Sequence, residues 1–315
     1  MPPRRGFTVL LITPDVFSGR PNPSSVVTDE AEARATLKDL LRERALLTDG
    51  PAPDAGLGLR GFSVELLNDE LSADFGASAR LFLPVGPAVG DGRASELAER
   101  LIALLGKGQA VAGAGDAAPM DEGLQQFLRD QLERTSRATA GDSSGAAVAA
   151  PTDASEAAQA AITCQIEFGA FNPGFWNNDA NVRLHNNCYN YASNKRTNTF
   201  AQPGRGCGHM YTAITCAEVT RGALCDGLHR RFNCFPAAQK PRYLVAMVVA
   251  PGPGFIDYHW YRKQKEGFWG HKPGSTAARN VDNSNHVVLD PVTCDRGPYT
   301  LFCGFFYTCA STKIN

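Results

Sequence analysis

The sequence predicts an α+β protein with two domains, and three observations support that prediction. At 315 residues the chain exceeds one typical domain but is too short for three. All nine cysteines and all six histidines lie at or after Cys164, so the two halves differ in chemistry. Between them, residues 107–160 contain two long stretches dominated by Gly, Ala, Ser, Thr, Pro and Asp, the composition of a flexible linker. We therefore expect one domain over residues 1–106 and a second over residues 161–315.

The first domain is predicted to be a small α/β sandwich whose elements follow the order βαββα. Its expected strands cover residues 7–12, 61–67 and 79–85, and its expected helices cover residues 28–46 and 94–105. Thr28 can cap the first of these helices, and the acidic residues after it suit the helix dipole. Because this domain contains neither His nor Cys, we expect it to serve folding, binding or targeting rather than catalysis.

The linker and the second domain contain further predicted elements. Residues 120–134 form one expected helix within the linker, which we interpret as docking on a neighbouring domain. In the second domain a loop enters a short helix at Cys188, and another helix is expected over residues 208–222. Alternation and aromatic or β-branched content predict strands at residues 242–250, 255–262, 267–271, 287–289 and 299–307. A nucleophile-bearing helix followed by an antiparallel sheet is an α+β arrangement.

Charge and hydropathy exclude several classes of protein. Residues 161–315 carry 16 Lys and Arg against 9 Asp and Glu, whereas residues 1–106 carry 11 against 15. Such an excess is usually solvated surface, so nucleic acid is not an expected partner. No stretch approaches 18 apolar residues, so no membrane span is expected. The apolar run at residues 7–12 is too short for a signal peptide and lacks a cleavage pattern.

The cysteines predict disulfides and an oxidising compartment, because nine of them fall in roughly half of the chain. We therefore expect a secreted or delivered protein in which most cysteines are paired. Their odd number leaves at least one thiol unpaired within the chain. No CxxC motif occurs, so the sequence indicates neither a zinc site nor an iron–sulfur cluster, and no other cofactor.

Cys188 is the candidate nucleophile because it follows Asn187, a residue that can N-cap a helix. In the first turn, unpaired backbone N–H groups and the helix dipole favour a thiolate. The same amides can donate hydrogen bonds to a developing oxyanion. These features predict an unpaired Cys188 with a pKa below the roughly 8.5 of a free thiol. The alternative is that Cys188 is half of a disulfide.

His259 is the candidate general base, because strand alternation places it on one face with Asp257 and Tyr261. A cysteine nucleophile needs such an imidazole to take its proton and return it to the leaving group. If the next hairpin is centred on Lys265, His271 lies opposite His259 and can orient its ring. A slip of one residue would turn His271 to the other face. The competing orienters are Asp282, Asn283 and Asp290.

This order of residues resembles the papain-like NlpC/P60 and CHAP superfamily of cysteine peptidases and amidases. More narrowly, several segments resemble a group of largely uncharacterised bacterial proteins. They are Asn-Cys-Tyr-Asn-Tyr-Ala at 187–192, Gln-Pro-Gly at 202–204, Asp-Tyr-His-Trp-Tyr-Arg at 257–262 and Trp-Gly-His-Lys-Pro-Gly at 269–274. Residues 15–23, Asp-Val-Phe-Ser-Gly-Arg-Pro-Asn-Pro, are similar to a recurrent opening of uncharacterised bacterial proteins. The resemblance implies a papain-like second domain with Cys188 as nucleophile, His259 as base and His271 as orienter.

Two functions are consistent with these features. The first is a thiol hydrolase of amide bonds, acting on peptides or peptidoglycan-type substrates through an acyl-enzyme on Cys188. The second is a non-enzymatic, disulfide-stabilised secreted or toxin-like module whose aromatic loops bind a partner. A metal site built from His259, His271 and a carboxylate is a third possibility that no tight ligand spacing supports.

Overall fold

The protein divides into two compact units. The computed structural model describes residues 9–52, 55–67, 80–86, 92–111, 119–139, 167–230 and 239–315. By their contacts, the first unit comprises Met1–Phe17 and Pro21–Ser144, and the second comprises Ser18–Arg20 and Gly145–Asn315. The first unit thus includes the helix that we expected in the linker. The tripeptide Ser18–Arg20 folds with the second unit, although it lies far from the rest of that unit in sequence.

The first unit contains a five-stranded sheet in the order β4-β3-β1-β2-β5, and all its pairings are antiparallel. The strands are β1 (Leu10–Asp15), β2 (Ser25–Val27), β3 (Gly61–Leu66), β4 (Arg80–Pro84) and β5 (Gln109–Ala110). The strands β1, β3 and β4 match the predicted ones to within a few residues. The prediction missed β2 and β5, because strands of two or three residues are too short for a periodic signal.

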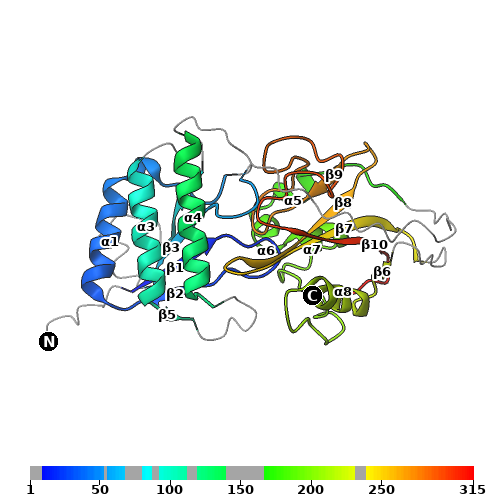
Figure 1. The fold of residues 1–315 in the computed structure, drawn as a ribbon, viewed down its shortest axis with the longest axis horizontal. Helices are drawn as coiled ribbons and strands as arrows, with labels where there is room; N and C mark the ends of the chain where they lie inside the picture. The colour runs from blue at the N-terminus through cyan, green and yellow to red at the C-terminus, as the bar shows by residue number, and fades with distance from the viewer. Residues whose placement is uncertain are drawn as a thin grey trace. The chain divides into compact units, whose positions relative to one another are not determined.

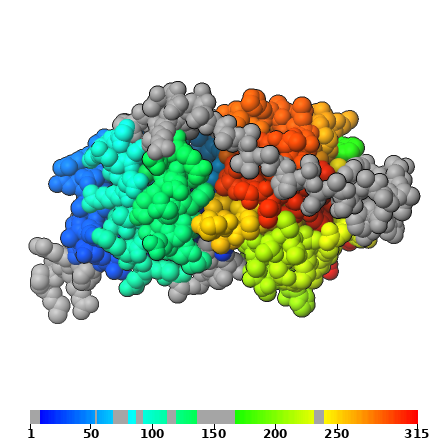
Figure 2. Space-filling view, in the orientation of Figure 1, coloured from blue at the N-terminus to red at the C-terminus, as the bar shows by residue number. Residues whose placement is uncertain are grey.

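Three helices lie side by side in the first unit (Figure 1) and form a continuous surface, coloured blue to green, in Figure 2. They are α1 (Glu30–Arg42), α3 (Gly92–Lys107) and α4 (Glu122–Thr139), and a 3-10 helix, η1 (Arg44–Leu46), follows α1. The N-cap of α1 is Asp29 rather than Thr28, since its carboxylate accepts the Glu32 N–H at 2.9 Å. Because α4 packs against α3, the predicted linker helix is part of this unit.

The second unit is built on another antiparallel sheet of five strands, in the order β6-β10-β7-β8-β9. Its strands are β6 (His229–Arg230), β7 (Tyr243–Pro251), β8 (Ile256–Lys263), β9 (Trp269–His271) and β10 (Leu301–Thr308). Its helices are α5 (Gly174–Asn177), α6 (Ala180–His185), α7 (Cys188–Ser193) and α8 (Cys216–Cys225). With helices and two antiparallel sheets, the protein has the predicted α+β class.

Alternation along the central strands of the second unit divides its interior into two sides. Val245, Met247 and Val249 on β7 pack with Tyr258 and Trp260 on β8 into one apolar core, which also contains residues of α7 and α8. The alternate residues of β8, which include the predicted base, lie on the opposite side of the strand. The strand β8 is therefore buried on both faces.

Two disulfides hold α8 in place. Cys207–Cys225 ties the loop before α8 to its last residue, and Cys216–Cys303 ties its first residue to β10. Three further cysteines of the described residues are outside any disulfide: Cys188, Cys294 and Cys309. The predicted presence of disulfides is confirmed. Four of the seven cysteines in the described residues are paired, and Cys164 and Cys234 lie outside those residues, so the expectation that most of the nine pair stays a prediction.

Two predicted elements of the second unit differ from the structure. The helix expected over residues 208–222 begins only at Cys216, after Gly208 takes a left-handed φ of 80° and Thr215 caps α8. The strand expected at residues 287–289 is a single bridge between Val281 and Val287. Among the described residues, no helix combines the length and the apolar character needed to cross a bilayer.

Candidate functional site

The helix α7 begins at Cys188, as predicted, because Asn187 and Asn190 form a reciprocal cap. The side-chain oxygen of Asn187 accepts the N–H groups of Tyr189 and Asn190, both at 3.1 Å. The side-chain oxygen of Asn190 in turn accepts the Asn187 N–H at 3.1 Å. This arrangement satisfies the first amides of the helix and fixes the position of Cys188.

Cys188 is unpaired and completely buried, with 0% of its surface exposed. Its Sγ lies 4.0 Å from the Tyr258 carbonyl oxygen and accepts a hydrogen bond from the Trp260 N–H, so it contacts the backbone on both sides of His259. Burial, and then the negative charge of Asp257, raise the pKa of the Cys188 thiol well above its usual value. The prediction of an unpaired thiol is confirmed. The prediction of an acidic thiol is wrong, because loss of solvent outweighs the amides of a six-residue helix.

His259 and His271 form a buried pair. The His259 Nε2 and His271 Nδ1 atoms are 2.8 Å apart, and the His271 Nε2 lies 2.8 Å from the Val281 carbonyl oxygen. Burial lowers the pKa of His271 to about 3, so its imidazole is neutral at physiological pH. A carbonyl oxygen only accepts, so the His271 Nε2 carries the proton and the His271 Nδ1 accepts from His259. With His259 neutral, its Nδ1 bears the lone pair that a general base requires.

The pairing of β8 with β9 differs from the predicted register by two residues. His271 lies opposite Tyr261, not opposite His259, so the hairpin is not centred on Lys265. A shift of two residues keeps every side chain on its face, whereas a shift of one would not. The His271 ring therefore stacks on Tyr261, with centroids 5.1 Å apart, and still reaches His259 diagonally.

The other candidate orienting residues form hydrogen bonds within the turns in which they lie. Asp282 accepts the N–H groups of Ser284, His286 and Asp295, and Asp290 accepts that of Val292. The Asn283 N–H donates to the Asp295 carbonyl oxygen at 3.1 Å. Of the four candidates, His271 is the residue that the structure places in a hydrogen bond with His259.

Asp257 is a buried carboxylate that holds the tripeptide Ser18–Arg20. Its oxygens accept the N–H groups of Ser18 at 2.6 Å, of Gly19 at 3.1 Å and of Arg20 at 3.0 Å. They also accept the Tyr299 hydroxyl at 2.5 Å. Burial raises the pKa of Asp257, and these hydrogen bonds act in the opposite direction. The carboxylate thus has four donors from its own chain.

The carbonyl oxygen of Gly19 makes further hydrogen bonds, and we call these and the contacts of Asp257 with Ser18–Arg20 the clamp. This oxygen accepts the side-chain amides of Asn187 at 2.7 Å and Gln202 at 2.8 Å, and the Tyr258 hydroxyl at 3.0 Å. A Cβ atom at Gly19 would lie 2.4 Å from the Tyr258 carbonyl oxygen, so only glycine allows this approach. Because Asn187 precedes Cys188, the tripeptide lies at the start of α7.

Tyr299 joins these parts into one cluster. Its hydroxyl contacts Asp257, its ring centroid is 5.6 Å from that of His259, and it interacts electrostatically with Cys188. Sequence reasoning missed both Tyr299 and the tripeptide. The tripeptide had a signal, since Ser18-Gly19-Arg20 lies in the recurrent segment at residues 15–23. Within the described part of the chain, no group of His, Cys, Asp and Glu is arranged to hold a metal ion.

Comparison with known proteins gives one clear relationship. No protein-family profile matches the chain, and no solved structure matches it significantly. Over 157 residues the chain is 43% identical to "Insoluble matrix shell protein 1" of Ruditapes philippinarum, an alignment that covers 50% of this chain and 99% of the relative. Since nearly the whole relative is matched at this identity, the chain belongs to the same family as insoluble matrix shell protein 1.

Proposed function

We propose that the second unit is a cysteine-nucleophile hydrolase of amide bonds in peptides or peptidoglycan-type substrates. Cys188 is the nucleophile, His259 the general base and His271 the residue that orients it. The observation that carries this proposal is the chain of hydrogen bonds from His259 through His271 to the Val281 carbonyl oxygen, at 2.8 Å each. It puts the lone pair of the base on Nδ1, and Cys188 lies against the backbone that bears this imidazole.

Cys188 packs with Tyr258 and Trp260, whereas His259 lies on the other face of β8, so the following steps occur once opening of the structure brings the imidazole to the thiol. The His259 Nδ1 takes the Cys188 proton as the thiolate attacks the substrate carbonyl carbon and a C–S bond forms. The resulting imidazolium gives the proton to the leaving amine as the C–N bond breaks, which leaves a thioester. A water molecule then attacks the thioester, loses its proton to His259, and releases the acid and the Cys188 thiol. His271 stays neutral throughout and keeps the His259 ring in place.

A substrate reaches this site only when the structure opens, because Cys188 and His259 are both fully buried. The tripeptide Ser18–Arg20 is the segment whose release opens the start of α7. It is held through backbone groups by Asp257, Asn187 and Gln202, so a substrate backbone that offers the same amides and carbonyl can replace it.

The test is acylation of Cys188 by p-nitrophenyl acetate, measured by intact-mass and peptide mass spectrometry, followed by hydrolysis of a peptide library. The expected result is an acetyl group on Cys188 and release of p-nitrophenol. His259→Ala should slow the release by about two to four orders of magnitude, the usual contribution of a general base. His209→Ala, an exposed histidine of the same unit, is the matched control and should leave it unchanged. Acetylation that never occurs on Cys188, or that is as fast in His259→Ala, would overturn the proposal.

A second candidate is a non-catalytic, disulfide-stabilised secreted module. The full burial of Cys188 and the raised pKa of its thiol favour it, as do the two disulfides of α8. The printed name of the relative, an insoluble shell matrix protein, also favours an extracellular structural role. This candidate predicts a stable protein in which Cys188 resists acylation in every variant that stays folded.

A further inference from the structure

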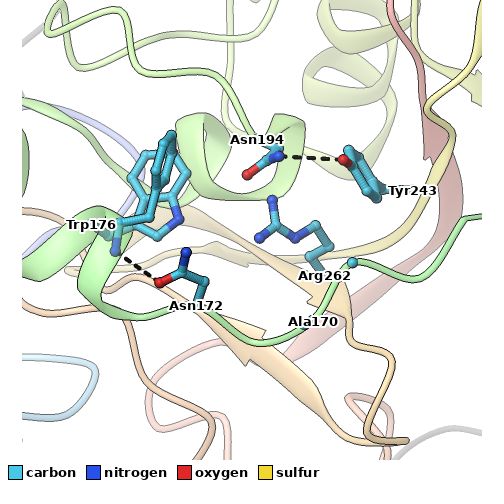
Figure 3. A pocket seen from close by; sticks show the side chains of 8 residues that line it. Ala170, Asn172, Trp176, Asn194, Tyr243 and Arg262 are labelled. Atoms are coloured by element: carbon cyan, nitrogen blue, oxygen red, sulfur yellow. Dashed lines mark hydrogen bonds between the residues drawn. The ribbon is translucent and has the colours of Figure 1, made fainter.

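A pocket of about 180 Å³ lies in the second unit, lined by residues from the segment before α5, from α5, from the end of α7 and from β7 and β8 (Figure 3). Its walls are aromatic, since Phe175 and Trp176 line it together with Tyr243. Two carboxamides, Asn172 and Asn194, and the guanidinium of Arg262 supply its polar groups. The pocket adjoins the C-terminal end of α7, whereas Cys188 lies at the N-terminal end of the same helix.

Arg262 is a buried cation in this pocket that has no counter-charge from the described residues. Only 5% of its surface is exposed, and no carboxylate of the described residues pairs with it. One nitrogen, Nη1, donates to the Tyr191 carbonyl oxygen at 2.7 Å, while the buried Nε has no acceptor among the described residues. The guanidinium carbon lies 4.5 Å from the ring centroid of Tyr191 and 5.3 Å from that of Tyr243. A buried cation with neutral partners only is unusual, because burial without a counter-charge is costly.

The acidic side chains near this pocket are already engaged. Glu266 accepts the Phe171 N–H with both oxygens at 3.1 Å. Glu167 accepts the Arg242 N–H and forms ion pairs with Lys240 and Arg242. A second guanidinium, that of Arg196, lies 3.3 Å from the centroid of the Phe175 ring and adds positive charge at the wall. The local field therefore favours an anion.

The neutral side chains of the pocket indicate the shape and polarity of the rest of the ligand. Asn194 donates through Nδ2 to the Tyr243 hydroxyl at 3.3 Å, and the Asn172 Oδ1 accepts the Phe175 N–H at 3.2 Å (Figure 3). The second interaction turns the Asn172 amide so that its NH2 group remains a donor. Flat rings pack favourably on aromatic walls, and a cavity of about 150 Å³ already accommodates a benzene-sized molecule.

We propose that this pocket binds a small carboxylate carried on a flat six-membered ring, with the carboxylate on Arg262 and the ring against the aromatic wall that Phe175, Trp176 and Tyr243 form. Arg262 holds the carboxylate by charge-assisted hydrogen bonds, for which its planar fork is well suited. The site is separate from Cys188 and does not depend on the proposed hydrolase activity.

The test uses benzoate as the probe and benzamide, which has the same shape without the charge, as its control. Binding to the full chain is measured by isothermal titration calorimetry and by the NMR shift of the Trp176 indole N–H. We expect saturable benzoate binding that shifts this signal, and benzamide binding at least tenfold weaker. No saturable benzoate binding, or equal binding of the two compounds, would overturn the proposal.

Variants locate the site. Arg262→Met, which keeps the length of the side chain, should weaken benzoate binding at least tenfold, the effect of losing one charge-assisted contact. Phe175→Ala removes an exposed wall residue, so it tests the same pocket in a folded protein even if Arg262→Met misfolds. Phe168→Ala, another exposed aromatic outside the pocket, is the control and should bind as the parent does. Unchanged benzoate affinity in Phe175→Ala and in a folded Arg262→Met would show binding elsewhere and contradict the assignment.

Discussion

Strand β8 buries two opposite charges five residues apart, and the protein treats them differently. Asp257 is completely buried and accepts four donors, three amides of Ser18–Arg20 and the Tyr299 hydroxyl. Arg262 is 5% exposed, donates one hydrogen bond to the Tyr191 carbonyl oxygen and otherwise faces aromatic rings beside a pocket. The chain thus supplies every hydrogen-bond partner of Asp257. It leaves part of the Arg262 guanidinium without a partner, which a ligand can supply.

A buried charge whose partners all come from the chain stabilises the fold, whereas a buried charge without a counter-charge can serve a ligand. When a buried charge with a full set of hydrogen bonds is removed, its buried partners are left without hydrogen bonds, which is strongly destabilising. Removing a buried charge that lacks a counter-charge costs little, since the desolvation penalty disappears with it.

The largest effect is expected for Asp257→Asn. An amide NH2 would face the backbone N–H donors of Ser18–Arg20, so we expect the free energy of unfolding to fall by about 3 kcal/mol. Urea denaturation at pH 7 measures it. Asp290→Asn, an exposed aspartate, is the matched control and should stay within about 0.5 kcal/mol of the parent. A loss below about 1 kcal/mol for Asp257→Asn would mean that the clamp contributes little to stability.

The second effect is the pH dependence of stability that His271 causes. Its pKa is about 3 in the folded protein and about 6.5 when unfolded, so the unfolded state binds more protons between these values. The stabilisation is complete above pH 6.5 and is lost as the pH falls toward 3. We expect the parent to lose about 1.4 kcal/mol per pH unit more than His271→Gln between pH 6 and 4. Parallel stability curves for the two proteins would show that His271 is accessible to protons.

The third effect is the release of the tripeptide by Gly19→Ala. The added Cβ would lie 2.4 Å from the Tyr258 carbonyl oxygen, a clash that costs about 1–3 kcal/mol. Because a buried thiol reacts through an open state, a loss of about 1.4 kcal/mol makes iodoacetamide label Cys188 about tenfold faster. Gly50→Ala, where the new Cβ meets nothing within 4 Å, is the control. Labelling as slow as in the control would show that the contacts of Ser18–Arg20 do not limit the access of iodoacetamide to Cys188.

The smallest effect is expected for Arg262→Met. The variant loses one hydrogen bond to Tyr191 but also the desolvation cost of the cation, so stability should change by about 1 kcal/mol or less. Chemical denaturation of the ligand-free protein measures this change. A loss as large as that of Asp257→Asn would make Arg262 a structural charge and remove the contrast between the two residues.

The sequence predicts local features of this protein better than long-range ones. The start of α7 at Cys188 follows from Asn187, and the strand around His259 follows from alternation, because both signals lie within a few residues. The hairpin register was off by two residues because the turn residues do not determine its centre. The face of His271 was nevertheless right, since an even shift preserves it.

Other features had no local signal. The contact between Gly19 and Tyr258 spans 239 positions, and nothing in either segment indicates the other. The high pKa of Cys188 arises from complete burial by distant segments, whereas the sequence shows only a helix start that favours a low one. Arg262 lies in a strand whose aromatic residues predict burial, but its unmatched charge becomes visible only with the neighbouring residues in place.

Activation of Cys188 by His259 is measured by the pH dependence of Cys188 alkylation. The rate of iodoacetamide labelling is followed by mass spectrometry from pH 5 to 9 in Gly19→Ala, which opens the site more often, and in the same variant with His259→Ala. Circular dichroism confirms that both are folded. If His259 takes the Cys188 proton, the double variant should label at least tenfold more slowly at pH 7, and its rate should rise only near the pKa of a lone thiol, about 8.5. Superimposable pH curves in two folded proteins would contradict the claim and leave Cys188 without a base.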